Sequence, residues 1–98
     1  MLESKYQARL IKKLEKMFPG CLVIKNDPNH RQGITDLLIL FGRNWAALEV
    51  KASANAPQRP NQAYYVDKMN EQSYAAFIYP ENENEVLHEL QLALGDSR

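Results

Sequence analysis

The chain has 98 residues, 45% of them hydrophobic, which suits one small domain over residues 1–98 with a single core. Its 12 basic and 12 acidic residues cancel, it has no run of about 18 apolar residues, and its first ten residues are too charged for a secretory signal. These features argue against a membrane or secreted protein and favour a cytoplasmic one. The single cysteine, Cys21, excludes an internal disulfide and a cysteine-rich zinc site.

The charges are unevenly distributed along the chain. Residues 1–68 contain eleven Lys and Arg residues against six Asp and Glu, a net charge of +5, and residues 69–98 contain one against six, a net charge of −5. This asymmetry permits a polyanionic partner on one side of the molecule. An ordinarily solvated protein with an acidic last helix is the plainer interpretation.

The first elements follow from apolar spacing. Apolar residues at intervals of three and four predict a helix over residues 2–17, which Pro19-Gly20 ends. A short strand over 21–25 comes next, and then a polar loop over 26–33 with strong turn signals.

A β-hairpin is predicted in the middle of the chain. Two short apolar runs, Leu37–Phe41 and Trp45–Val50, flank the turn Gly42-Arg43-Asn44. Glycine and asparagine between two such runs are typical of a hairpin turn.

The last part of the chain predicts a helix over 61–71, which begins after Pro60, a strand over 73–79, and a final helix from Asn82. The apolar residues of the final helix, and the tyrosines of the preceding one, are expected in the core or on a partner surface; they are Val86, Leu87, Leu90, Leu92, Leu94, Tyr64 and Tyr65. The order α-β-β-β-α-β-α predicts an α/β fold in which helices flank a mixed β-sheet.

Three charged residues occupy the hairpin where a core hairpin should have none. Asp36 precedes the first strand, and Glu49 and Lys51 share one face at the end of the second because side chains alternate along a strand. If the register pairs Asp36 with the region of Glu49, one end of the hairpin carries two carboxylates and an ammonium group. Placing these groups beside a core is costly unless they are paired or bind a metal.

The chemistry of these groups suits a divalent cation. Carboxylate and carbonyl oxygens are hard ligands, so Asp36, Glu49 and the backbone carbonyl of Val50 could converge on Mg²⁺ or Mn²⁺. Lys51 could orient or deprotonate a water molecule, or stabilise developing negative charge. The alternative without function is a pair of edge strands whose charged ends form an Asp36–Lys51 salt bridge.

The segments Gly33-Ile34-Thr35-Asp36 and Leu48-Glu49-Val50-Lys51 together resemble the PD-(D/E)xK nuclease superfamily, whose core is restriction-endonuclease-like. Thr35 stands where the superfamily motif has proline. Such motifs are hypotheses that the structural context must support.

Within that superfamily the chain resembles the VRR-NUC family, the virus-type replication-repair nucleases. The similar features are an N-terminal helix with Glu3 and Gln7, a G-x-x-D-L element at Gly33–Leu37, the strand Glu49-Val50-Lys51, and a helix that begins Pro60-Asn61-Gln62. The resemblance extends over nearly the whole chain.

This resemblance implies metal-dependent hydrolysis of DNA phosphodiesters by an endonuclease. It implies that Asp36 and Glu49 are metal ligands and that Lys51 is catalytic. It also implies supporting roles for Glu3, through the metal or a water molecule, and for Gln62, near the metal or the phosphate. Standalone domains of this type resemble Holliday-junction resolvases and imply a homodimer.

The sequence thus predicts a Mg²⁺- or Mn²⁺-dependent endonuclease that selects branched DNA such as Holliday junctions. The alternatives are a nuclease for flaps, ends or specific duplex DNA, and a catalytically silent DNA-binding domain. The residues expected to contact DNA are Lys5, Arg9, Arg31, Ser53 and Arg59.

Overall fold

The computed structural model describes residues 2–27 and 29–95. Over these residues the element order is α-β-β-β-α-β-α, as predicted, and each predicted boundary lies within one residue of the observed one. A short 3₁₀ turn, Pro80–Asn82, precedes the last helix. The elements are α1 (Glu3–Met17), β1 (Leu22–Lys25), β2 (Leu37–Phe41), β3 (Asn44–Val50), α2 (Pro60–Gln72), β4 (Tyr74–Ile78) and α3 (Glu83–Leu94).

The four strands form one mixed sheet in the order β1-β2-β3-β4. The first three strands are antiparallel, and β4 runs parallel to β3 after the crossover through α2. Phe41 pairs with Asn44, so the hairpin turn consists of Gly42 and Arg43, and Asn44 belongs to β3 rather than to the turn. Gly42 has φ +63°, a backbone conformation that a two-residue hairpin turn requires and that glycine adopts without strain.

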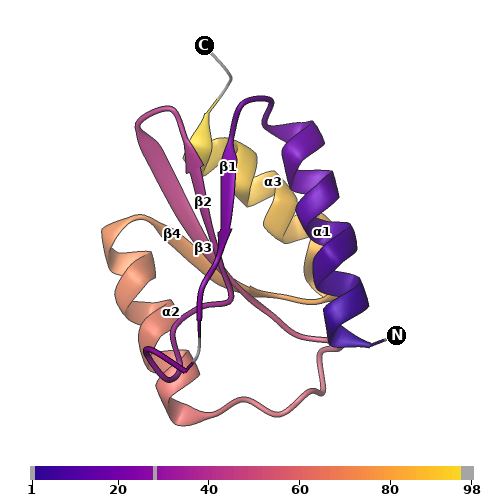
Figure 1. Ribbon diagram of the computed structural model, residues 1–98, viewed down its shortest axis with the longest axis vertical. Helices are drawn as coiled ribbons and strands as arrows, with labels where there is room; N and C mark the ends of the chain where they lie inside the picture. The colour runs from indigo at the N-terminus through magenta and orange to yellow at the C-terminus, as the bar shows by residue number, and fades with distance from the viewer. Residues whose placement is uncertain (1, 28, 96–98) are drawn as a thin grey trace.

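Helices α1 and α3 cover one face of the sheet, and α2 covers part of the other (Figure 1). The main core lies on the α1–α3 face, where alternate residues of the strands meet the buried stripes of the two helices. The strand residues on that face are Leu37, Ile39, Phe41, Ala46, Leu48, Val50 and Ile78.

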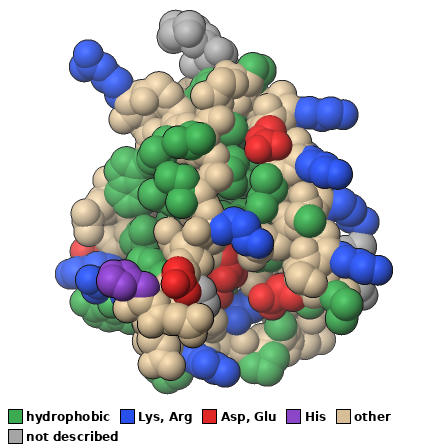
Figure 2. Space-filling view, in the orientation of Figure 1, with side chains coloured by type: hydrophobic (Ala, Val, Ile, Leu, Met, Phe, Trp, Pro, Cys, Tyr) green, Lys and Arg blue, Asp and Glu red, His purple; other side chains and the backbone are tan. Residues whose placement is uncertain are grey.

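The opposite face is built for close packing of α2 on β3 and β4. Ala47 and Ala75 are small and buried there, and Val66 and Met69 of α2 pack against them. Helix α2 makes its main sheet contacts with β3 and β4. It therefore does not cover the same face of β1 and β2. Figure 2 shows hydrophobic side chains gathered on this uncovered part of the molecule.

Two of the apolar residues expected in the core or on a partner surface lie outside the core. Leu92 is 73% exposed although Val86, Leu87, Leu90 and Leu94 of α3 are buried, because it lies off the helix face that meets the sheet. Tyr64 is likewise 57% exposed on α2. Within the described part of the chain, no helix is long and apolar enough to cross a membrane.

The loop between β1 and β2 is held by hydrogen bonds at its base and by close packing against α2. Asn26 donates from Nδ2 to the Thr35 carbonyl at 2.9 Å and from its backbone N–H to the Asp36 carbonyl at 2.9 Å. Gly33 has φ +88° and lies against α2, where a Cβ atom would be 2.6 Å from Cγ of Asn61. The loop therefore closes on the first turn of α2 only if residue 33 has no side chain.

We expect Gly33→Ala to lower the free energy of unfolding by more than the control Gly20→Ala. Both glycines have φ near +90°, so both substitutions carry the left-handed penalty of about 1–2 kcal/mol, but the space around Gly20 is empty whereas Asn61 crowds Gly33. Urea unfolding of the two variants measures the difference. Equal destabilisation would show that the close approach to α2 is unimportant.

Candidate active site

The hairpin brings the three predicted charged residues to one end of the sheet. Leu37 pairs with Leu48, so Asp36, which precedes β2, lies beside Glu49 of β3. Oδ2 of Asp36 accepts a hydrogen bond of 2.9 Å from the backbone N–H of Val50. Lys51 follows β3, and its N–H continues the ladder to the Ile78 carbonyl at 2.9 Å. The expected register is therefore confirmed.

Two of the three charged residues are buried, and Asp36 is half-buried. Glu49 is 3% exposed and Lys51 is 7% exposed. Burial, together with the negative charge of Asp36, raises the pKa of Glu49 to about 8. Burial also raises the pKa of Asp36 above its ordinary value. Two carboxyl groups in this position resist full ionisation unless positive charge is supplied.

One carboxylate oxygen of Glu49 has no partner. Oε1 of Glu49 is buried and makes no hydrogen bond, whereas Oε2 accepts from Nε2 of Gln62 at 3.0 Å. Buried carboxylate oxygens are normally satisfied, and an orphaned one needs an explanation such as an ion or a water molecule. This oxygen is the clearest sign that the site binds something more.

Gln62 connects the helix α2 to the charged residues. Its Oε1 accepts from Nζ of Lys51 at 2.9 Å and from the backbone N–H of Arg59 at 3.0 Å. The second bond caps the first turn of α2, and the first positions the ammonium group 3.8 Å from Oε2 of Glu49. Lys51 thus forms its ion pair with Glu49, and not the Asp36–Lys51 bridge of the alternative interpretation.

Glu3 approaches the site from the opposite side of the sheet. The segment after β3 passes beside the N-terminal end of α1 before it runs to α2 (Figure 1). Partial burial and the nearby charge of Asp36 raise the pKa of Glu3, and Lys51 opposes this shift. Among the described residues no group of three or more His, Cys, Asp or Glu side chains is placed to hold a metal ion. A role for Glu3 through water stays a prediction.

The oxygens of Asp36, Glu49 and the Val50 carbonyl suit a hard divalent cation. Within a strand, the N–H and C=O of one residue point to the same side, so the Val50 carbonyl points from the edge of β3 at which its N–H meets Asp36. Two carboxylates, one with an unpartnered oxygen, and a backbone carbonyl are ligands that suit Mg²⁺ or Mn²⁺. The residues present therefore fit the predicted metal.

A pocket of about 230 Å³ opens over Asp36 and Glu49. Arg59 and Gln62 line it from α2 and its N-cap, and the β1–β2 loop lines the other side. Three polar amides in its wall were not among the predicted site residues: Asn29, Gln32 and Asn61. For Asn61 the sequence contains a signal, because it lies inside the Pro60-Asn61-Gln62 element.

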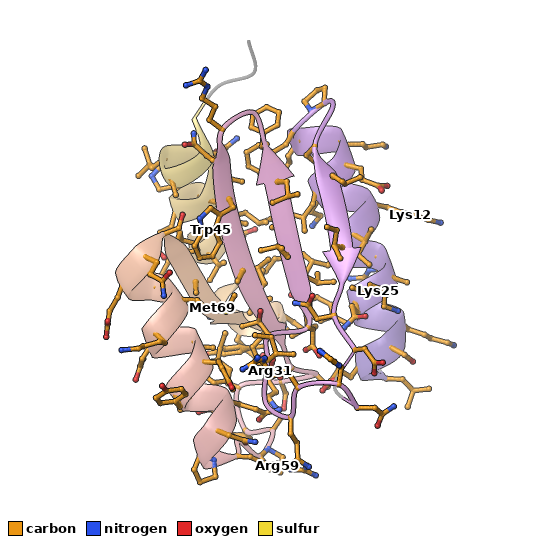
Figure 3. All side chains as sticks on the ribbon, turned by 60° about the vertical axis from the view of Figure 1, so that its left-hand side comes forward. Lys12, Lys25, Arg31, Trp45, Arg59 and Met69 are labelled. Carbon is orange, nitrogen blue, oxygen red and sulfur yellow. The ribbon has the colours of Figure 1, made fainter. Side chains whose placement is uncertain are left out.

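The structure brings two of the five expected DNA-contacting residues close to this end of the sheet. Arg59 lines the pocket, and Arg31 lies between the loop and α2, where its Nη1 donates to the Tyr65 hydroxyl at 3.3 Å (Figure 3). The other three do not line the pocket. Arg9 acts electrostatically on Glu83 at the other face, and Lys5 is exposed on α1. Ser53 is half-buried in the segment after β3.

Comparison with solved structures identifies a similar fold. A chain described as "VRR_NUC domain protein" superimposes with a TM-score of 0.73 and 16% sequence identity, over 100% of this chain and 93% of that one. The two proteins share a fold. No protein-family profile and no curated protein matches the sequence. The likeness confirms the predicted mixed sheet with flanking helices, and any function must be argued from the side chains of the site.

We expect the metal-free protein to lose stability as pH rises from about 5 to about 8. The pKa of Glu49 is raised above its ordinary value of 4.5 by folding, so the folded state retains a proton that the unfolded state has released. Unfolding free energies measured in excess chelator should fall over this range. Glu49→Gln should flatten the profile, whereas Glu71→Gln, which changes an exposed carboxylate of α2, should leave it unchanged. Equal slopes in all three proteins would contradict the burial argument.

Proposed function

We propose that this protein is a nuclease of the VRR-NUC type, which hydrolyses DNA phosphodiester bonds with Mg²⁺ or Mn²⁺. The observation that carries the proposal is the buried carboxylate of Glu49, whose unpartnered oxygen lies beside Asp36. An Asp36–Lys51 surface bridge would explain neither the burial of Glu49 nor its orphaned oxygen. The fold that the chain shares with a VRR_NUC domain protein also supports the nuclease hypothesis.

The proposed roles follow from the contacts of each group. Asp36, Glu49 and the Val50 carbonyl would hold the cation, which supplies charge stabilisation at the phosphate and a more acidic water molecule. The ammonium group of Lys51, held by Gln62 and 3.8 Å from Oε2 of Glu49, would stabilise negative charge that develops on the phosphate. Gln62 is a positioning residue, because its amide bonds both Lys51 and Glu49.

For the substrate we propose branched DNA, including Holliday junctions. Flaps, ends and specific duplexes are the alternative substrates. Arg31 and Arg59 offer positive charge beside the pocket for phosphate contacts. A silent DNA-binding domain is the alternative from another class, but it has no use for an intact set of Asp36, Glu49 and Lys51 at this cost of burial.

We also propose that two copies of the chain associate through β1. Among the residues that the structure describes, no strand pairs with the outer edge of β1, and its Leu22 and Ile24 are 58% and 37% exposed. Leu38 and Leu40, their register partners on β2, extend the apolar surface. Antiparallel pairing of β1 with β1 of a second copy would satisfy the free edge and bury both apolar surfaces around a two-fold axis. Two sites related in this way can cut two strands.

We expect Asp36→Asn, Glu49→Gln and Lys51→Ala each to abolish or strongly reduce DNA cleavage. The first two remove the negative charge that holds the cation, and the third removes an electrostatic stabiliser worth about 10²-fold or more in rate. Cleavage by the unchanged protein should require Mg²⁺ or Mn²⁺ and stop in excess chelator. A cleavage assay on linear, flap and four-way-junction DNA measures both effects.

Gel shifts and thermal melts of the same variants provide the control. DNA binding should persist at a fixed salt concentration because it depends on dispersed Lys and Arg contacts to phosphate. Arg43→Ala, in the exposed hairpin turn at the other end of the strands, should cut normally. If Lys51→Ala melts much lower yet cuts at the normal rate, its role is structural.

We expect light scattering to give about twice the 11.3 kDa mass of one chain. Ile24→Lys should shift the protein towards the monomer by placing charge in the apolar surface of β1. The matched control is Leu92→Lys, which adds the same charge to an exposed leucine of α3 and should leave the mass unchanged. A monomeric mass at protein concentrations that cut DNA would contradict the dimer. If only Leu92→Lys gave a monomer, the interface would lie on α3 and not on β1.

A further inference from the structure

A second pocket of about 460 Å³ adjoins the first. Ile34 lines both pockets, so they meet at the β1–β2 loop. The second pocket is otherwise lined by Asn26, Asp27, His30 and Arg31, and of these only Arg31 has a part in the proposed function. Its volume is within the range of about 300–1,000 Å³ that is typical of small-molecule sites.

The walls of this pocket suit a nucleobase better than a simple anion. Arg31 offers a flat guanidinium group that the Tyr65 hydroxyl steadies at 3.3 Å, and His30 offers an imidazole. Asp27 opposes the positive charge of Arg31, which disfavours a pocket for phosphate alone. A base presents both donors and acceptors and a flat face, so it can use a mixed set of this kind.

The pocket has a fixed shape on its inner side. Asn26 lines the pocket, and its Nδ2 donates to the Thr35 carbonyl at 2.9 Å, which holds this side chain in place. Oδ1 of Asp27 accepts the Asn29 N–H at 2.9 Å, and the Asp27 carbonyl accepts the His30 N–H at 3.1 Å. These bonds organise the turn from which His30 and Arg31 project.

The connection between the pockets decides which nucleotide could enter. A strand whose scissile phosphate lies at Asp36 and Glu49 would bring a neighbouring nucleotide past Ile34 to the second pocket. A base inside a duplex is stacked and its pairing edge is occupied, so it enters only after unstacking at a cost of a few kcal/mol. An unpaired base avoids this cost.

We propose that the second pocket binds the base of an unpaired nucleotide adjacent to the phosphate that is cut. This inference rests on the proposed nuclease function, and among the substrates named above it favours flaps and branch points that have unpaired nucleotides beside the cut over fully paired Holliday junctions. Arg31 and His30 are the residues that recognise the base, and Tyr65 positions Arg31.

The test uses a single-stranded oligonucleotide that contains 2-aminopurine, whose fluorescence changes when the base leaves its stacked neighbours. Binding is measured in excess chelator at one salt concentration, so no cleavage occurs. We expect the double variant His30→Ala/Arg31→Ala to lose about tenfold in affinity, and Tyr65→Phe to lose less. Lys12→Ala, which removes an exposed charge on α1 away from the loop, is the matched control and should bind normally (Figure 3).

A competition with duplex DNA of the same sequence completes the test. The unchanged protein should prefer the single strand, and the double variant should lose that preference. Unchanged affinity of the double variant, or an equal loss in Lys12→Ala, would overturn the base pocket, since either result leaves only general charge attraction. Cleavage assays on the same oligonucleotides are interpreted separately. Failure to cut any DNA with Mg²⁺ or Mn²⁺ would overturn the nuclease proposal, while a specific loss of affinity in the double variant would still support the pocket.

Discussion

The structure depends on one costly arrangement, the burial of the Glu49 carboxyl group beside that of Asp36. Two carboxyl groups so close together in a poorly solvated place destabilise the protein unless protons or cations compensate them. Three neighbours reduce the cost: the N–H of Val50, the amide of Gln62 and the ammonium group of Lys51. They leave one oxygen of Glu49 without a partner. An ordinary core would replace such a residue with an apolar one, so its presence favours a function that needs the charge.

The two faces of the sheet have different roles: one holds the main core, and the other positions the site. The α1–α3 face buries most of the large apolar side chains and supplies most of the hydrophobic stabilisation. The α2 face uses Ala47 and Ala75, whose small side chains let the helix approach and bring Gln62 over the end of β3. This arrangement explains why Gly33 has to be small where the loop meets the helix.

Much of the fold was predictable because apolar spacing and turn residues are local signals. The alternation in Leu37–Phe41 and Trp45–Val50 indicated the hairpin, and the same alternation placed Glu49 and Lys51 on one face. Gln62 was different: its contact with Glu49 spans 13 residues, and only the resemblance to a known family pointed to it. The closure of the loop on Asn61 and the second pocket depend on tertiary contacts that no local pattern encodes. At Leu92 the local pattern suggested a contact that does not form: this apolar residue of the last helix is exposed to solvent.

The central claim is that the carboxylates of Asp36 and Glu49 form a cation site, and anomalous scattering from Mn²⁺ in crystals of the protein tests it most directly. The account predicts one strong peak within coordination distance of Asp36, of the orphaned oxygen of Glu49 and of the Val50 carbonyl. The peak should disappear in crystals of Glu49→Gln grown and soaked in the same way. A peak elsewhere in the molecule, or no peak at a Mn²⁺ concentration that supports DNA cleavage, would contradict the account.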